Sequence, residues 1–342
     1  MLCLAMSWAW ADEFKELHSA EVTVPDQARS TQNSVLGKVF ANVLVKLSGQ
    51  RILPDNATAE LLGTRARSSL QSVTYHHYNL PIDEQTEFSE LRLQARFNND
   101  SVNNTLVFLG LPRWPVERRQ LLFIMAIESD NERRLISTDD GFLAFVASDT
   151  ARARGLPLEV SLEQAGDDFD ISWLQEIWGG FTETPLAESR AKGFDGVLLA
   201  SASLRGGRWQ LRWNMAIAER EWTWSLRDND LYRALANGIH GAADRMSAHA
   251  AIQPADQGRW LEPVEVANIR SNREYLRCMA YLQGLDLVKR VEIISVQGEK
   301  IRFQLELSAA PEYLHQSIER GELLELVGAS MGTGARIYQL VN

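Results

Sequence analysis

The stretch RWQLRWNMAIAEREWTWSL, residues 208–226, carries four tryptophans and decides how the middle of the chain must fold. In each half of it, apolar and polar residues alternate. This is the pattern of a half-buried β-strand, because successive side chains of a strand point to opposite faces. The stretch therefore predicts a β-hairpin with one apolar face and one polar face. The apolar face is expected to hold Trp209, Leu211, Trp213, Met215 and Ile217 from the first strand, and Trp222, Trp224 and Leu226 from the second.

The residues after the hairpin predict a helix that covers this apolar face. Its apolar stripe is Leu231, Leu235, Ile239, Ala242 and Met246, at the spacing of one helix face. Each buried aromatic side chain removes roughly 150–250 Å² from water, so the helix and the tryptophans together make a core. The alternative is an aromatic platform for a ligand or a partner. On that interpretation the candidate binding residues are Trp209, Trp222 and Trp224, with Trp222 at the rim of the hairpin.

On both sides of the hairpin the residues predict an α+β chain of three small α/β-sandwich modules in series. A polar stretch around residues 114–119, with Pro115 within it and Pro112 just before it, predicts a linker after the first module. In the last module the expected order is β-α-β-β-α-β, which is that of a ferredoxin-like sandwich. The expected boundaries are 12–113, 119–252 and 260–342.

The first eleven residues, MLCLAMSWAWA, are uncharged and mostly apolar, and Ala9-Trp10-Ala11 fits the small-x-small rule for signal-peptidase cleavage. We therefore expect residues 1–11 to be a signal peptide, shortened at its start because no Lys or Arg precedes the apolar run, and the mature protein to be periplasmic. The alternative is an apolar N-terminal strand. After cleavage Cys278 would be the one remaining cysteine, which excludes an intrachain disulfide and predicts a buried, inert thiol.

The composition of the chain limits which classes of partner and ligand we expect it to bind. A net charge of −10 argues against a nucleic-acid partner, whose phosphates require a basic footprint. No later apolar run approaches the roughly 18 residues of a membrane span. We expect no cofactor and no metal. His76 and His77 are adjacent on a predicted strand and so point to opposite faces, and the acidic stretch AGDDFD (165–170) lacks the spacing and glycine of a calcium loop.

One motif suggests catalysis. GASMG, residues 328–332, matches the nucleophile elbow of hydrolases, with Ser330 as the nucleophile. That chemistry requires a helix after the turn and an acid and a histidine downstream. Here ten residues follow, they alternate like a strand, and they contain no Asp, Glu or His. A loop between two strands explains the motif better, and we expect no catalytic residue.

Several stretches carry a resemblance to a known family. VTVPDQARST (22–31), VLVKLSG (43–49) and GLPRW (110–114) resemble domain-of-unknown-function family 2066, secreted proteins of Gram-negative bacteria. In layout, the middle segment is similar to the N-terminal domain of TolB and to penicillin-binding-protein activators. These resemblances imply a binding role in the envelope and bring no catalytic residues.

We therefore expect a non-catalytic periplasmic adaptor or accessory protein, which binds another envelope or inner-membrane protein through a groove between modules or an exposed sheet edge. The alternative is a periplasmic protein that binds a small molecule or glycan on the Trp-rich hairpin. A hydrolase built on Ser330 comes third.

Overall fold

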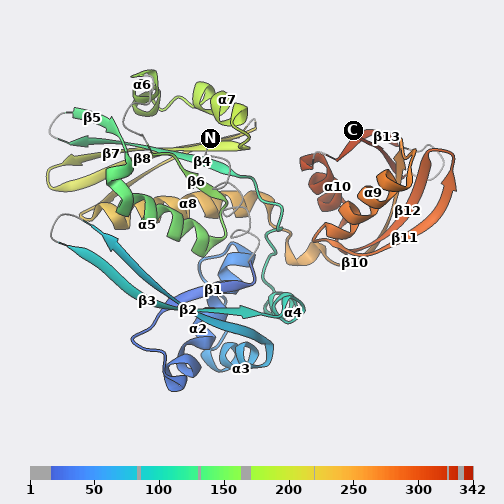
Figure 1. The fold of residues 1–342 in the computed structure, drawn as a ribbon, viewed down its shortest axis with the longest axis horizontal. Coiled ribbons are helices and arrows are strands. Elements are labelled where there is room, and N and C mark those ends of the chain that lie inside the picture. Colours follow the sequence, from blue (N-terminus) through green and yellow to red (C-terminus); the bar gives the residue numbers. More distant parts are fainter. Residues whose placement is uncertain are drawn as a thin grey trace. The chain divides into compact units, whose positions relative to one another are not determined.

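The computed structural model describes residues 17–82, 86–129, 132–162, 171–218, 220–321, 323–329 and 335–341. The expected signal peptide 1–11, the acidic stretch 165–170 and Ser330 lie outside these residues. The chain forms two compact units. Unit 1 comprises Met1–Leu109 and Arg118–Ala250, and unit 2 comprises Gly110–Glu117 and Ala251–Asn342. Three sheets, each with its own helices, confirm the predicted α+β class (Figure 1).

The first sheet of unit 1 is antiparallel, with the strand order β1-β3-β2. Helix α2 packs on it through a buried stripe that includes Phe40, whose ring meets that of Phe97 edge to face at 5.0 Å. Gly49 ends α2 in the left-handed conformation, with a φ of 73°, as its position after the apolar stripe predicts. The elements are β1 (Ser19–Thr23), α2 (Arg29–Ser48), α3 (Ala59–Ser69), β2 (Leu70–Pro81), β3 (Glu87–Phe97) and α4 (Asn99–Leu109).

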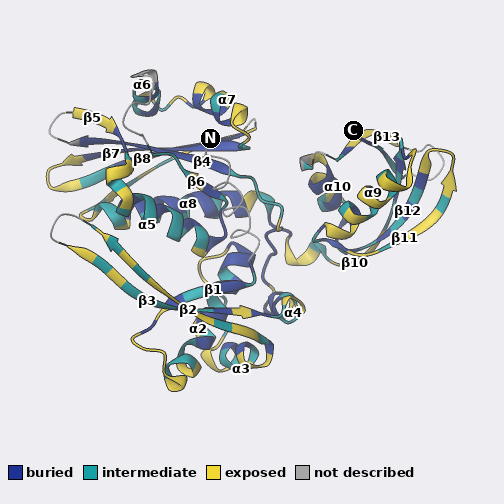
Figure 2. Ribbon diagram, in the orientation of Figure 1, coloured by how far each residue is buried: buried dark blue, intermediate teal, exposed yellow. Residues whose placement is uncertain are grey.

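The second sheet of unit 1 has six strands in the order β5-β4-β7-β8-β9, with β6 paired to β4. Helices α5 and α8 cover one face and α6 and α7 the other (Figure 1). Strands β4 and β7 are parallel and buried on both faces, which is why LLFIMAI and GVLLASAS are continuous apolar runs (Figure 2). The elements are β4 (Leu121–Ser129), β5 (Glu132–Leu135), α5 (Gly141–Arg154), β6 (Leu158–Val160), α6 (Ile171–Gly179), α7 (Glu183–Ala191), β7 (Gly196–Arg205), β8 (Arg208–Ile217), β9 (Arg220–Asp228) and α8 (Leu231–Ala250).

The Trp-rich hairpin is β8 and β9, and its apolar face lies beneath α8. Trp213 is fully buried, with its ring stacked between Phe123 at 5.7 Å and Trp224 at 5.8 Å. Gly238 of α8 lies directly over Trp213, so close that an added Cβ would be 1.9 Å from the indole Cζ2. The helix approaches the sheet this closely because position 238 has no side chain, and the indole fills the space that a side chain would otherwise take.

The first sheet of unit 1 packs through aromatic rings against α5, the helix that covers one face of the second sheet. At the far end of the β2–β3 hairpin, Phe88 contacts Phe142 and Phe145 of α5, each at 5.4 Å between ring centroids. Tyr78 of β2 contacts Phe145 at 5.6 Å. These contacts explain why residues of the first two expected modules form one compact unit.

Unit 2 has a five-stranded sheet in the order β11-β12-β10-β14-β13, with α9 and α10 contributing to one core. Up to α10 the topology is ferredoxin-like. It then continues as a hairpin whose second strand, β14, runs parallel to β10 and separates it from β13. Tyr338 and Leu340 of β14 are buried, whereas Leu326 and Val327 of β13 are exposed, so the strand with the buried apolar side takes the inner position. The elements are β10 (Gln257–Ala267), α9 (Asn272–Gly284), β11 (Val288–Gln297), β12 (Lys300–Ala309), α10 (Pro311–Arg320), β13 (Leu324–Ala329) and β14 (Arg336–Leu340).

The GLPRW stretch belongs to unit 2. Arg113 forms an antiparallel bridge with Ile252, and its guanidinium donates to the Ser308 hydroxyl at 2.9 Å. Trp114 is 2% exposed. The stretch that the two prolines predict to be a linker is therefore held by backbone pairing and by a buried indole.

Candidate functional site

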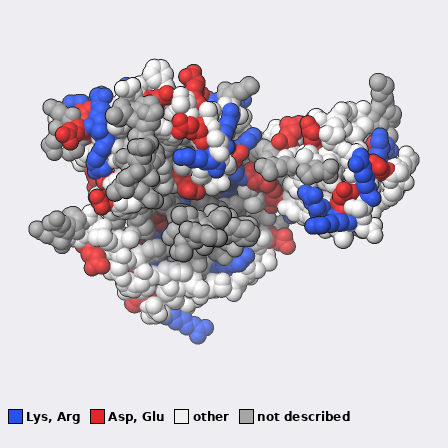
Figure 3. Space-filling model, turned by 45° about the horizontal axis from the view of Figure 1, so that its top comes forward, with Lys and Arg blue, Asp and Glu red and all other residues white. Residues whose placement is uncertain are grey.

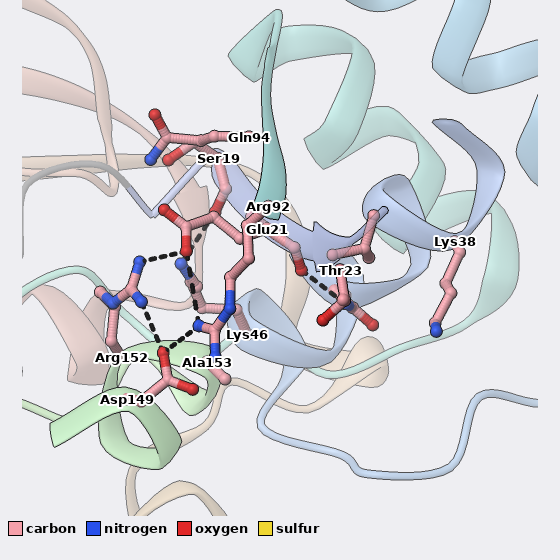
Figure 4. A pocket seen from close by; sticks show the side chains of 13 residues that line it. Ser19, Glu21, Thr23, Lys38, Lys46, Arg92, Gln94, Asp149, Arg152 and Ala153 are labelled. Atoms are coloured by element: carbon pink, nitrogen blue, oxygen red, sulfur yellow. Dashed lines mark hydrogen bonds and ion pairs between the residues drawn. The ribbon is translucent and has the colours of Figure 1, made fainter. Parts of the chain in front are cut away.

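A cavity of about 270 Å³ lies at the outer edge of β1, lined by α2, β3 and α5 (Figure 4). Its walls are polar because the alternate side chains of β1 that face away from the core, Glu21 and Thr23, point into it. Asn42 of α2 donates to the Glu21 carbonyl at 3.3 Å, and Lys46 donates to the Ser19 carbonyl at 2.8 Å.

Two arginines and three carboxylates form an ion network along this cavity. Arg92 binds Glu90 at 2.8 Å. Arg152 binds Glu21 at 2.8 Å, and both arginines bind Asp149 (Figure 4). Burial lowers the pKa of both guanidinium groups, but the adjoining carboxylates outweigh it and raise the pKa above the ordinary value. The two guanidinium groups therefore stay charged at physiological pH. The network joins β1 and β3 to α5.

A third arginine, which is fully buried, connects elements in a similar way. Arg154 of α5 is 2% exposed and donates to the Gly49 carbonyl at 2.6 Å and to Asp244 of α8 at 2.7 Å. Its Nη1 lies 3.4 Å from Nδ1 of His240. Burial, together with the charges of Arg51 and Arg154, lowers the pKa of His240 to about 4. A guanidinium only donates, so Nδ1 must accept, and the imidazole is neutral.

The three candidate tryptophans are all half-buried. Trp224 stacks on Trp213, and the guanidinium of Arg245 lies 4.3 Å from its ring centre. Trp222 lies 6.4 Å from the ring of His249, and Trp209 opposes Asp228 across the ladder. Side chains of the same chain thus cover the ring face of Trp224, an arrangement that favours the core interpretation. The structure brings Trp222 and Trp224 to the edge of the sheet, because β9 is its last strand.

Strand β11 of unit 2 is a second sheet edge, which sequence reasoning missed. Its second half exposes Ile293, Ile294 and Val296, at 47, 50 and 60% (Figure 2). The sequence contains a signal for this surface. Ile293 and Ile294 are adjacent, and two successive strand residues cannot both face the core.

The remaining candidates from the sequence are placed as follows. His76 and His77 are exposed on β2, and the described residues hold no group of three metal-ligating side chains. Cys278 is fully buried and unpaired, and burial raises the pKa of its thiol to about 12, which confirms the predicted inert cysteine. Of the GASMG motif, Gly328 and Ala329 end β13, and Ser330 lies outside the described residues.

Among the described residues of unit 2, His315, Tyr338 and Glu262 form a buried polar chain. His315 of α10 lies 2.7 Å from the Tyr338 hydroxyl and 3.2 Å from Glu262. Burial raises the pKa of Tyr338 to about 12, so the phenol is a weak nucleophile at neutral pH. These hydrogen bonds satisfy the polar groups of His315, Tyr338 and Glu262 inside the core of unit 2.

No helix among the described residues is both long enough and apolar enough to cross a membrane. On the face shown in Figure 3, acidic and basic side chains lie interspersed. Such a surface has no wide area of a single charge that would attract one class of partner over distance.

Comparison with known proteins gives a family match for the N-terminal third. Residues 11–115 match the model of a domain of unknown function, DUF8605. No curated protein matches the chain. One solved structure, the N-terminal domain of Protein Y from Thermus thermophilus, is 13% identical, covers 25% of this chain and 90% of its own, and has a TM-score of 0.16.

The expected resemblance to family 2066 is therefore wrong, and so is the expected similarity of the middle segment to the N-terminal domain of TolB and to penicillin-binding-protein activators. The stretches at residues 22–31, 43–49 and 110–114, which carried it, all lie inside the DUF8605 match. Physically, these stretches are a strand followed by a helix start, the buried end of α2 with its glycine cap, and the chain's entry into unit 2. Such features recur in unrelated families, because packing and capping require them.

Proposed function

We propose that the chain is a non-catalytic adaptor of the bacterial cell envelope, which binds another envelope protein by adding a strand of that partner to β11. The apolar outer edge of the unit 2 sheet carries this proposal. Proteins ordinarily protect an edge strand with lysine, proline or a covering element, because its open backbone groups pair with other chains. The first half of β11 has Lys289 and Arg290, and an irregularity in the pairing with β12 falls at Ile294. The second half nevertheless exposes the apolar side chains of Ile293, Ile294 and Val296.

The chemistry of the partner follows from this edge. An extended segment that pairs with β11 gains backbone hydrogen bonds, and its alternate apolar side chains cover the exposed isoleucine and valine side chains. The exposed residues in the second half of β11 are mostly apolar, so we expect the partner segment to be apolar and β-branched where it pairs with this half. We expect binding there to depend weakly on salt.

Affinity capture with a matched pair of variants tests the adaptor proposal. We expect the Ile294→Lys protein to capture much less envelope protein than the unaltered chain does, because a lysine on an edge strand opposes strand addition. Leu276→Lys, on α9 and 63% exposed, is the control and should capture as well as the unaltered chain. Both substitutions are at exposed positions and should change the free energy of unfolding by no more than about 0.5 kcal/mol. Equal capture by all three proteins would remove β11 as the binding edge.

The periplasm is the proposed location, supported by the signal-like composition of residues 1–11. We expect the protein recovered from the periplasmic fraction of a Gram-negative bacterium to begin at Asp12, directly after the small-x-small triplet. N-terminal sequencing of that fraction measures this. An intact N-terminus in the cytoplasmic fraction would contradict it.

A further inference from the structure

We infer that two copies of this chain pair through β9, edge to edge and antiparallel, in one register that the sequence of β9 specifies. This surface is in unit 1, and the inference does not depend on the adaptor proposal for β11. Strand β9 is the last strand of the six-stranded sheet, and it pairs with β8 on one side over its whole length.

The backbone N–H and C=O groups of successive β9 residues point alternately toward β8 and away from it. Ile217 and Arg220 are paired across the β8–β9 hairpin, and two residues separate them in the sequence. In a hairpin with a two-residue loop, the residues that flank the loop form a hydrogen-bonded pair. Every second residue after Arg220 therefore also bonds to β8. The residues between them direct their N–H and C=O groups outward, and no backbone group of the described residues bonds to them. These four residues are Glu221, Thr223, Ser225 and Arg227.

An antiparallel copy must match outward residues with outward residues. The nine residues of β9 are Arg-Glu-Trp-Thr-Trp-Ser-Leu-Arg-Asp. When Trp224 lies on the two-fold axis, Thr223 and Ser225 form a hydrogen-bonded pair, and so do Glu221 and Arg227. This register is compatible with the alternation of the strand and pairs all nine residues.

The same register matches charge and side-chain type. Each Glu221 opposes an Arg227 of the second copy, and Arg220 at one end opposes Asp228 at the other. Trp222 opposes Leu226, and the two Trp224 rings meet on the axis. Among the described residues, no side chain forms a hydrogen bond or ion pair with that of Arg227, so its charge is available to a partner. Opposite charges that face each other across two strands stabilise the pairing, and like charges destabilise it.

The neighbouring registers lack this match. A shift of the axis to Thr223 places Glu221 opposite Ser225, and a shift to Ser225 places Thr223 opposite Arg227. Registers in which the two-fold axis lies between two neighbouring residues are also excluded. In them, residues whose backbone groups point outward would oppose residues whose backbone groups point toward β8. The register centred on Trp224 is therefore the one in which both charged pairs form.

Pairing also covers the apolar surface that remains at the edge. Trp222, Trp224 and Leu226 are half-buried beside α8 in a single chain, and each would gain an apolar neighbour from the second copy. Two six-stranded sheets would become continuous, with the tryptophan faces of both copies on the same side. An edge that is joined in this way is closed to further strands.

A charge exchange tests this pairing and its register together. Analytical ultracentrifugation of the purified protein should show a concentration-dependent dimer. Arg227→Glu places two like-charged pairs in the interface and should raise the dimer dissociation constant roughly tenfold or more. The double variant Glu221→Arg with Arg227→Glu restores opposite charges and should recover most of the affinity. Positions 221 and 227 are too far apart along one strand to contact each other, so recovery requires a second copy.

Two further proteins separate the pairing from general effects. Ser225→Pro removes an outward N–H and leaves the bonds to β8 intact, so it should yield a folded monomer. Arg290→Glu, which makes the same charge change on β11 of unit 2, should leave the dissociation constant unchanged. A protein that stays monomeric at all concentrations would overturn the inference. So would a dimer that is unaffected by Arg227→Glu, or one that the double variant fails to restore.

Discussion

The Trp213→Ala protein is expected to lose about 3–5 kcal/mol of its free energy of unfolding, which is the range for removal of a large buried aromatic side chain. The loss should lie in the upper part of this range. Trp213 stacks on Phe123 and Trp224, and Gly238 has no side chain that could move into the vacated space. The measurement is urea denaturation followed by far-ultraviolet circular dichroism, with the transition of unit 1 analysed separately from that of unit 2.

The control for this prediction lies on the neighbouring strand. Leu204 of β7 is 51% exposed, so Leu204→Ala should change the free energy of unfolding by no more than about 1 kcal/mol. If Trp213→Ala proved as mild as Leu204→Ala, the indole would not be part of the core. The aromatic-platform interpretation of the hairpin would then return, with Trp209, Trp222 and Trp224 as its binding residues.

The sequence is sufficient to predict the hairpin and its covering helix, because both depend on local periodicity. Alternation along residues 208–226 and the stripe from Leu231 to Met246 each fix which side faces inward. The same reasoning predicts the buried Cys278 and explains why Gly49 caps α2, since each depends on a few neighbouring residues.

The sequence is insufficient where the outcome depends on residues far apart in the chain. The network of Glu21, Arg92 and Arg152 and the contacts of Arg154 with Gly49 and Asp244 join segments that no periodicity connects. The position of β14 between β10 and β13 is of the same kind, because a strand pattern identifies its buried side and leaves its neighbours open. The edge positions of β9 and β11 likewise follow from the strand order, which the sequence of neither strand reveals.

The stability of unit 1 should fall as the pH falls from 6.5 towards 4, and His240 should be a main cause. In the folded protein, burial and the charges of Arg51 and Arg154 lower the pKa of His240 from 6.5 to about 4, and Asp244 opposes this in part. Between these values the unfolded chain binds a proton that the folded chain does not. The imidazole therefore contributes stability that is fully present above pH 6.5 and is lost progressively as the pH falls towards 4. A shift of this size corresponds to on the order of 3 kcal/mol.

Carboxylates also take up protons in acid and change the stability of the protein. Substitution of His240 separates the contribution of this histidine to the pH dependence from that of the carboxylates. Glutamine can accept the hydrogen bond from Arg154 but does not titrate, so His240→Gln should lose much less stability than the unaltered chain between pH 6.5 and 4.5. His76→Gln, which replaces an exposed histidine on β2, should keep the original pH dependence. The measurement is the free energy of unfolding of all three proteins at a series of pH values. Parallel curves for the unaltered and His240→Gln proteins would mean that the imidazole is charged in the fold. The arginine joint between α2, α5 and α8 would then have to be arranged differently around it.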